Sequence, residues 1–413
     1  MARAAASRGL PVALLVALLI AGCGADGNPP RTPTLAVTPS ATPTSTSTPA
    51  PTLAATPRVT SSPRPAAWRQ VPGQAPVDGA VFLDVVWTGA RFVAAASDAA
   101  SRGVFLDSAD GVVWHRQPSL GSVGESVKLA AGPGGVVAVS LVDGHLTSWV
   151  SPDGLAWTPN RDAFRTRTGS RSFGDVDDVV ADGDGWLAVG AHEPRCYDIC
   201  APDRALVWTS TDGKSWTEIP EHKALDGGWM NAVDHGPTGF VAVGESANAG
   251  AAVWTSLDGL AWALVSKDPL FVGPAGPDYG TAATGVAVTD SGTAVVGYAG
   301  LADDTMAVMT WWSPSGSAWS RADETWASDS MPTVAATPDG FLGTWSGACP
   351  GGIWASNGPS WRCDASDPPF AGFQPAAGAA SETITVVVGT LDVAPDAESP
   401  APPIGTVWYR TRT

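Results

Sequence analysis

The sequence predicts an all-β fold in which seven similar sheets are arranged in a ring. Three observations predict it. A short apolar run occurs seven times, a turn motif follows six of these runs, and turn-forming residues are abundant, with 47 Gly and 36 Pro among 413 residues. A charged fraction of 15% argues against a coiled coil or a helix-rich enzyme. Repeats of about 40 to 50 residues with four strands each are typical of a β-propeller.

The apolar run has five residues, and most copies end in a small residue. Successive copies begin 44, 50, 54, 53, 48 and 44 residues apart, and six of the seven follow a turn signal that contains Gly. A five-residue apolar run bounded by turns indicates a strand that is buried on both faces. The seven copies are Phe92–Ala96, Val136–Ser140, Trp186–Gly190, Phe240–Gly244, Thr293–Gly297, Phe341–Trp345 and Thr385–Gly389.

The turn motif has the form Ser-x-Asp-Gly-x-x-Trp. Asp can accept hydrogen bonds from backbone N–H groups of its own turn, and Gly adopts a positive φ that other residues resist. Two further copies are degenerate: Ser315 replaces the Asp in one, and Ser356–Trp361 is one residue shorter. The residues of the four intact copies are Ser108, Asp110 and Trp114; Ser151, Asp153 and Trp157; Ser210, Asp212 and Trp216; and Ser256, Asp258 and Trp262.

This motif resembles the Asp-box, or BNR, repeat of sialidase-like β-propellers. The resemblance implies a seven-bladed β-propeller of four-stranded antiparallel blades, in which the box residues have structural roles. A repeat resemblance implies a fold and not a reaction.

Tryptophan positions support the same fold and predict how the ring closes. A second Trp lies two residues before most box serines, and Trp408 occupies the equivalent place in the last repeat, which has no box. The segment beginning at Trp68 resembles the segment that follows a box, so we expect it to form the outer strand of the last blade. With Trp68 included, 13 of the 19 Trp belong to this pattern, and we interpret them as blade core.

The amino terminus has the features of a bacterial lipoprotein signal. Two arginines precede an apolar run, Leu10–Ala21, which is shorter than the ~20 residues of a membrane-spanning helix. The run ends in Ile20–Cys23, which resembles the lipobox, where the signal is cut before the cysteine and the thiol receives a diacylglycerol. This resemblance implies a signal peptide over residues 1–22 and lipidation of Cys23. An ordinary secretory signal with an incidental cysteine is the alternative.

Residues 23–66 are expected to form a lipid-anchored, disordered linker, and residues 67–413 the propeller. Between residues 28 and 65, 25 of 38 residues are Pro, Thr or Ser and none is acidic. Residues 1–66 hold five Arg and one Asp, so the propeller has 23 − 5 = 18 basic and 40 − 1 = 39 acidic residues, a net charge of −21. This acidity excludes a nucleic-acid partner. We expect an exported monomer held by its lipid on the outer face of the cytoplasmic membrane or in the cell envelope.

The remaining four cysteines fit an oxidising compartment. Cys196 and Cys200 share one loop of the third repeat, and Cys349 and Cys363 flank the outer hairpin of the sixth. We expect two local disulfides. A metal site formed by His192 with Cys196 and Cys200 is the alternative, although no fourth ligand is evident.

Loops of variable length on the face opposite the boxes are the candidate binding region, because such loops on a rigid scaffold often carry function. One of them holds the densest positive cluster, which can bind a carboxylate or sulfate, although a solvated loop balanced by nearby aspartates is the simpler interpretation. That cluster is Arg161, Arg165, Arg167 and Arg171. The candidate loops are Arg161–Arg171, His192–Arg204, Lys267–Tyr279 and Asp392–Pro403.

No residue is assigned a catalytic role, and no metal or cofactor is expected. Sialidases use three arginines, a Tyr–Glu pair and an acidic proton donor, and none of the four tyrosines here is matched to a Glu by motif. We therefore expect a non-catalytic binding or assembly scaffold for an unknown protein or glycan. The alternatives are a divergent sialidase-like glycoside hydrolase, which would have clustered acids and a Tyr–Glu pair at the ring centre, and a lectin that uses exposed aromatics such as Trp229 or Trp326.

Overall fold

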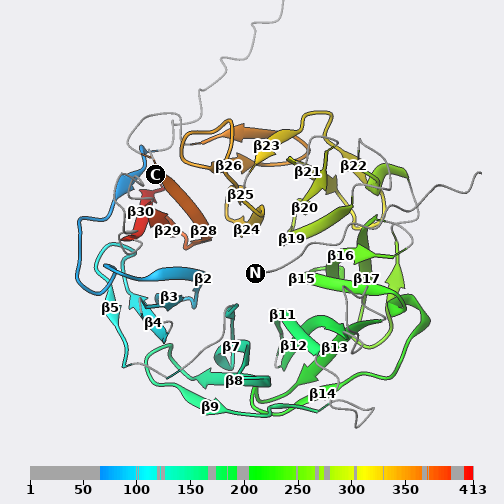
Figure 1. The fold of residues 1–413 in the computed structure, drawn as a ribbon, viewed down its shortest axis with the longest axis horizontal. Helices are drawn as coiled ribbons and strands as arrows, with labels where there is room; N and C mark the ends of the chain where they lie inside the picture. The colour runs from blue at the N-terminus through cyan, green and yellow to red at the C-terminus, as the bar shows by residue number, and fades with distance from the viewer. Residues whose placement is uncertain are drawn as a thin grey trace, which may run out of the picture. The chain divides into compact units, whose positions relative to one another are not determined.

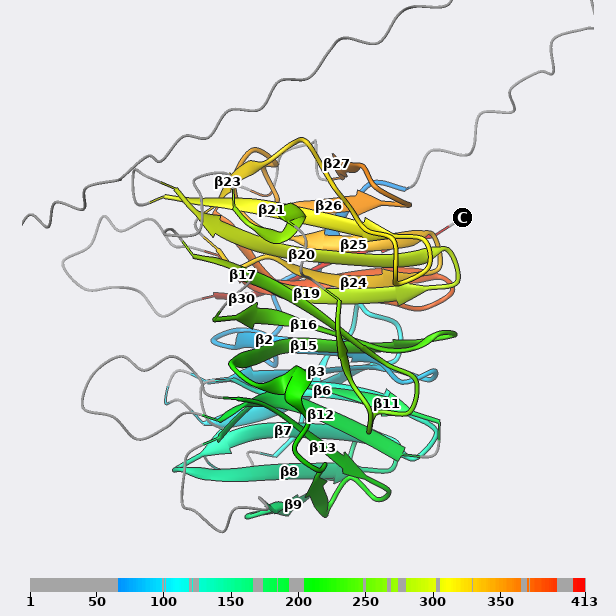
Figure 2. The same cartoon turned by 90° about the vertical axis from the view of Figure 1, so that its right-hand side faces the viewer.

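The computed structural model describes residues 66–98, 100, 102–118, 121, 126–165, 174–183, 185–192, 204–247, 250–265, 269–273, 280–301, 305–328, 330–364, 370, 372–391 and 404–412. All of them belong to one compact unit, Ser61–Thr413. Seven sheets stand around a central axis (Figure 1). Figure 2 shows the ring from its edge, with the strands running between its two faces. The predicted seven-bladed β-propeller is therefore confirmed, and the described residues contain no α-helix.

Each blade is a four-stranded antiparallel meander whose first strand lies at the ring centre (Figure 1). The first three blades have the following strands in order: β2 (Val81–Trp87), β3 (Phe92–Ser97), β4 (Gly103–Ser108) and β5 (His115–Arg116); β6 (Lys128–Gly132), β7 (Gly135–Val142), β8 (His145–Ser151) and β9 (Thr158–Asn160); β11 (Gly174–Asp182), β12 (Gly185–His192), β13 (Arg204–Ser210) and β14 (Trp216–Glu218).

The next three blades repeat this order. Two short 3₁₀ turns, η1 (Lys223–Leu225) and η2 (Pro269–Phe271), lie between strands. The strands are β15 (Gly228–Gly236), β16 (Gly239–Ser246), β17 (Gly250–Ser256) and β18 (Ala263–Leu264); β19 (Thr281–Thr289), β20 (Gly292–Gly300), β21 (Met306–Ser313) and β22 (Ser320–Arg321); β24 (Thr333–Thr337), β25 (Gly340–Thr344), β26 (Ile353–Ser356) and β27 (Trp361–Cys363).

The seventh blade is built from both ends of the propeller. Its three inner strands are β28 (Phe373–Ala380), β29 (Ile384–Leu391) and β30 (Ile404–Thr411), and its outer strand is β1 (Arg69–Gln70). Gln70 is the register partner of Trp408, and the Val71 amide donates to the Val407 carbonyl at 2.8 Å. The predicted closure of the last blade by the first strand is confirmed.

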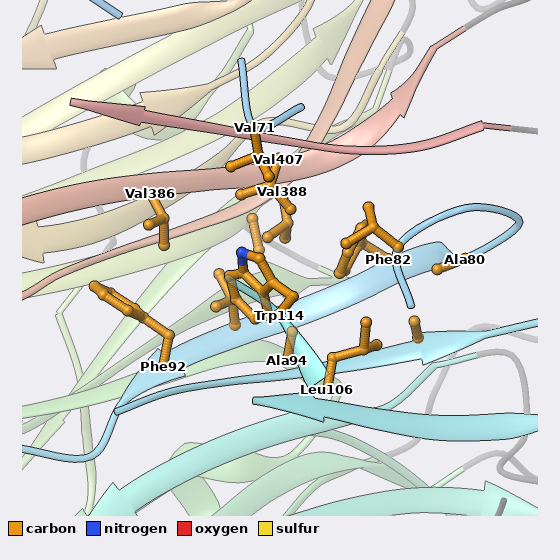
Figure 3. Close-up of a cluster of buried hydrophobic side chains, with 14 of the residues drawn as sticks. Val71, Ala80, Phe82, Phe92, Ala94, Leu106, Trp114, Val386, Val388 and Val407 are labelled. Atoms are coloured by element: carbon orange, nitrogen blue, oxygen red, sulfur yellow. The ribbon is translucent and has the colours of Figure 1, made fainter. Parts of the chain in front are cut away.

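The chain after β1 then joins the last blade to the first. The Gln74 side chain donates to the Val112 carbonyl at 2.7 Å and accepts from the Trp114 amide at 3.0 Å, so it is hydrogen-bonded to the first box turn. Figure 3 shows Trp114 among side chains of both blades, such as Val386 and Val407 of the seventh and Phe82 and Leu106 of the first. Burial of this cluster excludes water from the junction where the chain closes on itself.

A β-bulge explains why most copies of the apolar run end in a small residue. The register of β15 with β16 shifts between Met230 and Ala232, and this brings the Trp229 carbonyl oxygen within 1.8 Å of the point where a Cβ on Gly244 would lie. Side chains at this point would collide with backbone, and backbone cannot move aside as a flexible side chain can. Gly190, Gly297 and Gly389 meet the same obstacle, at 1.8, 2.2 and 2.1 Å.

The four intact Ser-x-Asp-Gly-x-x-Trp turns share one set of hydrogen bonds. In the turn from Ser210, the hydroxyl donates to Asp212 Oδ1 at 3.1 Å, and Asp212 Oδ1 accepts the amides of Lys214 and Ser215 at 2.8 and 2.9 Å. Gly213 has a φ of 68°. Bonds from the Ala261 and Leu260 amides to the equivalent Asp258 lower the pKa of that carboxyl.

The box glycines also join neighbouring blades. A Cβ on Gly213 would lie 2.5 Å from Val137 of the preceding blade, and one on Gly259 would lie 2.7 Å from Leu187. Each box turn therefore packs against the second strand of the blade before it. In the seventh blade, which has no box, Arg412 pairs instead with Asp339 of the sixth blade at 2.6 Å.

One of the two expected disulfides lies within the described residues. Cys349 and Cys363 are bonded, with Cα atoms 5.4 Å apart. Cys196 and Cys200 lie outside the described residues, as do Cys23 and the predicted signal and linker.

Candidate functional site

The central channel is the main cavity candidate for a ligand. It has a volume of about 420 Å³ and is bounded by the innermost strand of every blade. Its walls consist largely of Ala, Val and Gly, with charged side chains on one side. The charged and imidazole-bearing lining residues are Asp84, Lys128, Asp178, Asp234 and His235, and the apolar side includes Val286, Val334, Ala335, Ala336, Ala377 and Gly378.

Three of the channel aspartates join neighbouring blades. Asp84 accepts the Val85 amide on its own strand and the Leu129 amide of the next blade, both at 2.8 Å. Asp178 likewise accepts the Val233 amide of the next blade at 2.9 Å. Asp234 is the third aspartate with such bonds. It accepts the His235 amide of its own strand and the Val288 amide of the fifth blade, both at 2.7 Å.

These aspartates pay a desolvation penalty for their position. Burial raises the pKa of Asp178 to about 7, although Lys128 and two backbone amides oppose the rise. Burial likewise raises the pKa of Asp234 to about 6. Both carboxyls therefore carry protons at pH values where they would be ionised in an unfolded chain.

Lys128, the first residue of β6, lies between these carboxyls. Burial opposes its charge, but attraction to Asp84, Asp178 and Asp177 outweighs this and raises the pKa of the ammonium group. Among the described residues, its Nζ has no hydrogen bond and no ion pair. Lys128 is only partly buried, so its ammonium group is accessible from the cavity and can take a partner there.

A second group of polar residues lies in the third, fourth and fifth blades, toward the ends of their inner strands on the face of the predicted ligand loops. These blades each have one register pair at the equivalent position of their first two strands. These pairs are Asp175 with Ala191, Trp229 with Glu245, and Ala282 with Tyr298. In the third blade, the neighbouring pair of Gly174 with His192 lies at the end of the sheet, where the predicted loop begins at His192. We call Asp175, Asp177, Trp229, Glu245 and Tyr298 the mouth cluster.

The mouth cluster contains several polar groups without a protein partner. Trp229 Nε1 donates to Asp177 Oδ2 at 2.7 Å, which fixes the indole. The carboxylates of Asp175 and Glu245 and the Tyr298 hydroxyl have no hydrogen bond or ion pair to any described residue. All three are half-buried, and burial raises the pKa of each. Half-buried polar groups that gather without partners are typical of a binding site.

The structure brings Tyr298 close to an acid that the sequence motif did not identify. After burial, the charge of Glu245 is the second cause that raises the pKa of Tyr298. The sialidase-like alternative predicts clustered acids and a Tyr–Glu pair at the ring centre. The described channel lining is instead mostly Ala, Val and Gly, and it includes neither Tyr298 nor Glu245. Arginines are also absent from the described lining, and Lys128 is its one described cation.

The predicted arginine loop lies elsewhere, as far as it is described. Phe164–Arg165 forms a short strand, β10, which pairs in parallel with β14 at the outer edge of the third blade. Phe164 stacks on Trp216 with ring centroids 4.9 Å apart, and this contact holds the segment away from the ring centre. Arg161 and Arg165 are exposed there, whereas Arg167 and Arg171 lie outside the described residues.

The aromatic side chains expected for a lectin are less exposed than the sequence predicts. Trp326 belongs to β23 (Trp326–Ser328), an additional strand of the fifth blade, and its ring lies 5.0 Å from that of Trp354. Trp326 is therefore packed against the sixth blade. Trp229 is half-buried in the mouth cluster and presents part of its ring there.

The described residues contain no group of three or more His, Cys, Asp or Glu side chains able to hold a metal ion. The alternative metal site includes Cys196 and Cys200, which are not described. Within the described ranges, no helix has the length and apolar character needed to cross a membrane.

Sequence reasoning missed Asp84, Lys128 and Asp178 because they lie in the innermost strands, outside the repeated motifs. The sequence does contain a pattern that could identify two of them. Asp84 and Asp178 each stand eight residues before an apolar run and are each followed by two valines. A carboxylate inside an apolar strand requires a specific partner, and here that partner is a backbone amide of the next blade.

The buried aspartates of the channel and the mouth cluster predict an acidic optimum of stability. Between about pH 4 and pH 7 the folded protein binds protons at Asp177, Asp178 and Asp234 that the unfolded chain does not, so the free energy of unfolding falls as the pH rises through this window. The box aspartates have lowered pKa values, so their contribution is lost below about pH 4. Thermal unfolding followed by circular dichroism should give a higher midpoint at pH 5 than at pH 8, with a contribution of about 2 to 3 kcal/mol from each carboxyl whose pKa is about 7.

The substitution Asp178→Asn removes one of these groups and should reduce the difference between the two midpoints. A midpoint that increases from pH 5 to pH 8, or an unchanged difference in the variant, would show that the channel carboxyls are ionised in the folded state.

Many solved structures match this chain, and one of them serves as an example. The chain is similar to the SapL1 lectin in complex with alpha methyl fucoside, with 14% identical residues and a TM-score of 0.44, covering 70% of this chain and 97% of that one. The chain matches no protein-family model and no curated protein sequence.

Proposed function

We propose that this protein is a lipid-anchored extracytoplasmic binding module, without catalysis, whose ligand is recognised by the mouth cluster of the central channel. The proposal has three further parts. Cys23 is lipidated, residues 23–66 form a flexible linker, and the box turns belong to the Asp-box repeat type. The observation that carries it is the set of half-buried polar groups at the mouth that have no protein partner among the described residues.

The chemistry of the mouth cluster favours a neutral or cationic polar ligand, such as a neutral glycan or an amino sugar. Asp175, Asp177 and Glu245 offer hydrogen-bond acceptors, Tyr298 offers a hydroxyl, and the fixed indole of Trp229 offers a stacking surface. An anionic sugar would approach three carboxylates, and the exposed arginines described at the outer edge of the third blade lie on a different part of the ring.

The geometry also favours binding over turnover. The aspartates in the channel hold backbone amides of two blades with their carboxylate oxygens, so the scaffold fixes their position. A glycosidase needs a proton donor and a nucleophile on opposite sides of one bond. The divergent hydrolase stays the alternative, carried by the proximity of Glu245 to Tyr298.

A glycan array that holds neutral, amino-sugar and sialylated glycans tests the binding site. We expect binding to neutral or amino-sugar glycans, and a loss of at least tenfold in affinity in the double variant Asp175→Asn, Glu245→Gln. The matched control is Glu382→Gln, which removes an exposed carboxylate from the turn between β28 and β29. Binding limited to sialylated glycans, or unchanged in the double variant, contradicts the proposed site. Release of sugar that is abolished by Tyr298→Phe would establish the hydrolase instead.

Anchoring has a separate test. In a bacterial host, the full-length chain should incorporate an alkyne-labelled fatty acid and partition into the detergent phase of Triton X-114, whereas Cys23→Ser should do neither. An unlabelled wild-type chain that is recovered in the aqueous phase would indicate an ordinary secretory signal.

A further inference from the structure

The channel below the mouth cluster contains an ammonium group whose hydrogen-bonding partner is missing. Lys128 lines the cavity, is partly buried, and has no hydrogen bond or ion pair to the residues that the structure describes. The simplest structural role for a lysine in this position is an ion pair with a neighbouring carboxylate. Asp84 and Asp178 attract Lys128, but neither makes that contact.

The reason lies in the hydrogen bonds of the two aspartates. Each carboxylate is held by one amide of its own strand and one amide of the next blade. Rotation of either carboxylate toward Lys128 would leave a backbone amide without a partner in the interior, which costs free energy. The scaffold thus keeps a positive group and two carboxylates apart, with open volume beside them.

The remaining wall of the cavity has a different character. The fifth, sixth and seventh blades contribute mainly small apolar side chains, among them Val286, Val334 and Ala377, together with Thr284 and Thr333. Carboxyl groups of these blades do not contribute to the described lining. The cavity therefore has a wall bearing both charges and, across the channel, an apolar wall.

We propose that the channel binds a small aliphatic zwitterion, of the class of an apolar α-amino acid, with its carboxylate on Lys128 and its ammonium group between Asp84 and Asp178. Its aliphatic part packs against the Val and Ala side chains of the fifth to seventh blades. A volume of about 420 Å³ accommodates such a molecule. This inference rests on the proposed binding function and names a ligand class for its channel.

The charges of the lining disfavour the two simpler ligand types. An aliphatic carboxylate would satisfy Lys128 but would stand beside two carboxyls without a compensating cation. An aliphatic amine would satisfy the carboxyls but would be repelled by Lys128 and would leave it without a partner. A zwitterion is neutral overall and matches both signs.

Three probes of one carbon skeleton test the proposal by isothermal titration calorimetry on the full propeller. They are L-leucine, 4-methylpentanoate, which lacks the amino group, and 3-methylbutan-1-amine, which lacks the carboxylate. We expect L-leucine to bind at least tenfold more tightly than either of the others. Lys128→Met should reduce the affinity for L-leucine at least tenfold, and Lys223→Met, a change at an exposed lysine of η1, should leave it unchanged.

A second measurement needs no variant. L-leucine should slow hydrogen exchange in peptides that cover β6 and β15, because their Leu129 and Val233 amides donate to the two aspartates beside the ligand. Absence of L-leucine binding, equal binding of the three probes, or unchanged affinity in Lys128→Met overturns the proposal. Glycan binding that depends on Glu245 but not on Lys128 would then leave the proposed function standing with a different ligand.

Discussion

The outer strand of the seventh blade comes from the opposite end of the propeller, and the rest of the structure depends on that pairing. Arg69 and Gln70 lie against Tyr409 and Trp408, Trp68 lies 4.8 Å from the Arg410 guanidinium, and the following residues pack between the seventh blade and the first. Without β1, the seventh sheet would have an open edge, and the cluster around Trp114 would lose Val71 and Val77. Closure therefore completes a sheet and a hydrophobic core at the same place.

A closed ring can hold groups in positions that would be unfavourable in a looser scaffold. Box turns contact the preceding blade at the periphery, and the aspartates of the first, third and fourth blades contact the next blade at the centre. Neighbouring blades are thus joined at the periphery, and three pairs of them are also joined at the centre by aspartates, which holds the channel side chains in place. That constraint is the physical origin of the unpartnered Lys128, Asp175 and Glu245 among the described residues, and of the binding role proposed for them.

Much of the fold could be predicted from sequence because its signals are local and repeated. The apolar runs correspond to the second strand of each blade, and Trp68 and Trp408 identified the closing blade. The channel could not be predicted in the same way. Its geometry depends on β-bulges that shift register by one residue, as between Val176 and Asp178, and no motif marks them except the small residue on the facing strand. Likewise, the parallel pairing of β10 with β14 depends on Phe164 fitting against Trp216 of the next blade.

The central claim, that the first strand closes the ring in the observed register, has a direct test. The double variant Arg69→Cys, Tyr409→Cys places two cysteines at register partners, where neighbouring Cα atoms lie within the reach of a disulfide. Peptide mass mapping under oxidising conditions should find an intramolecular disulfide between the two introduced cysteines in the monomer. The control pair Arg69→Cys, Arg410→Cys, whose second cysteine points to the other face of the strand, should form little of it. Equal cross-linking of the two pairs, or cross-links that join separate molecules, would contradict the closure and the channel built upon it.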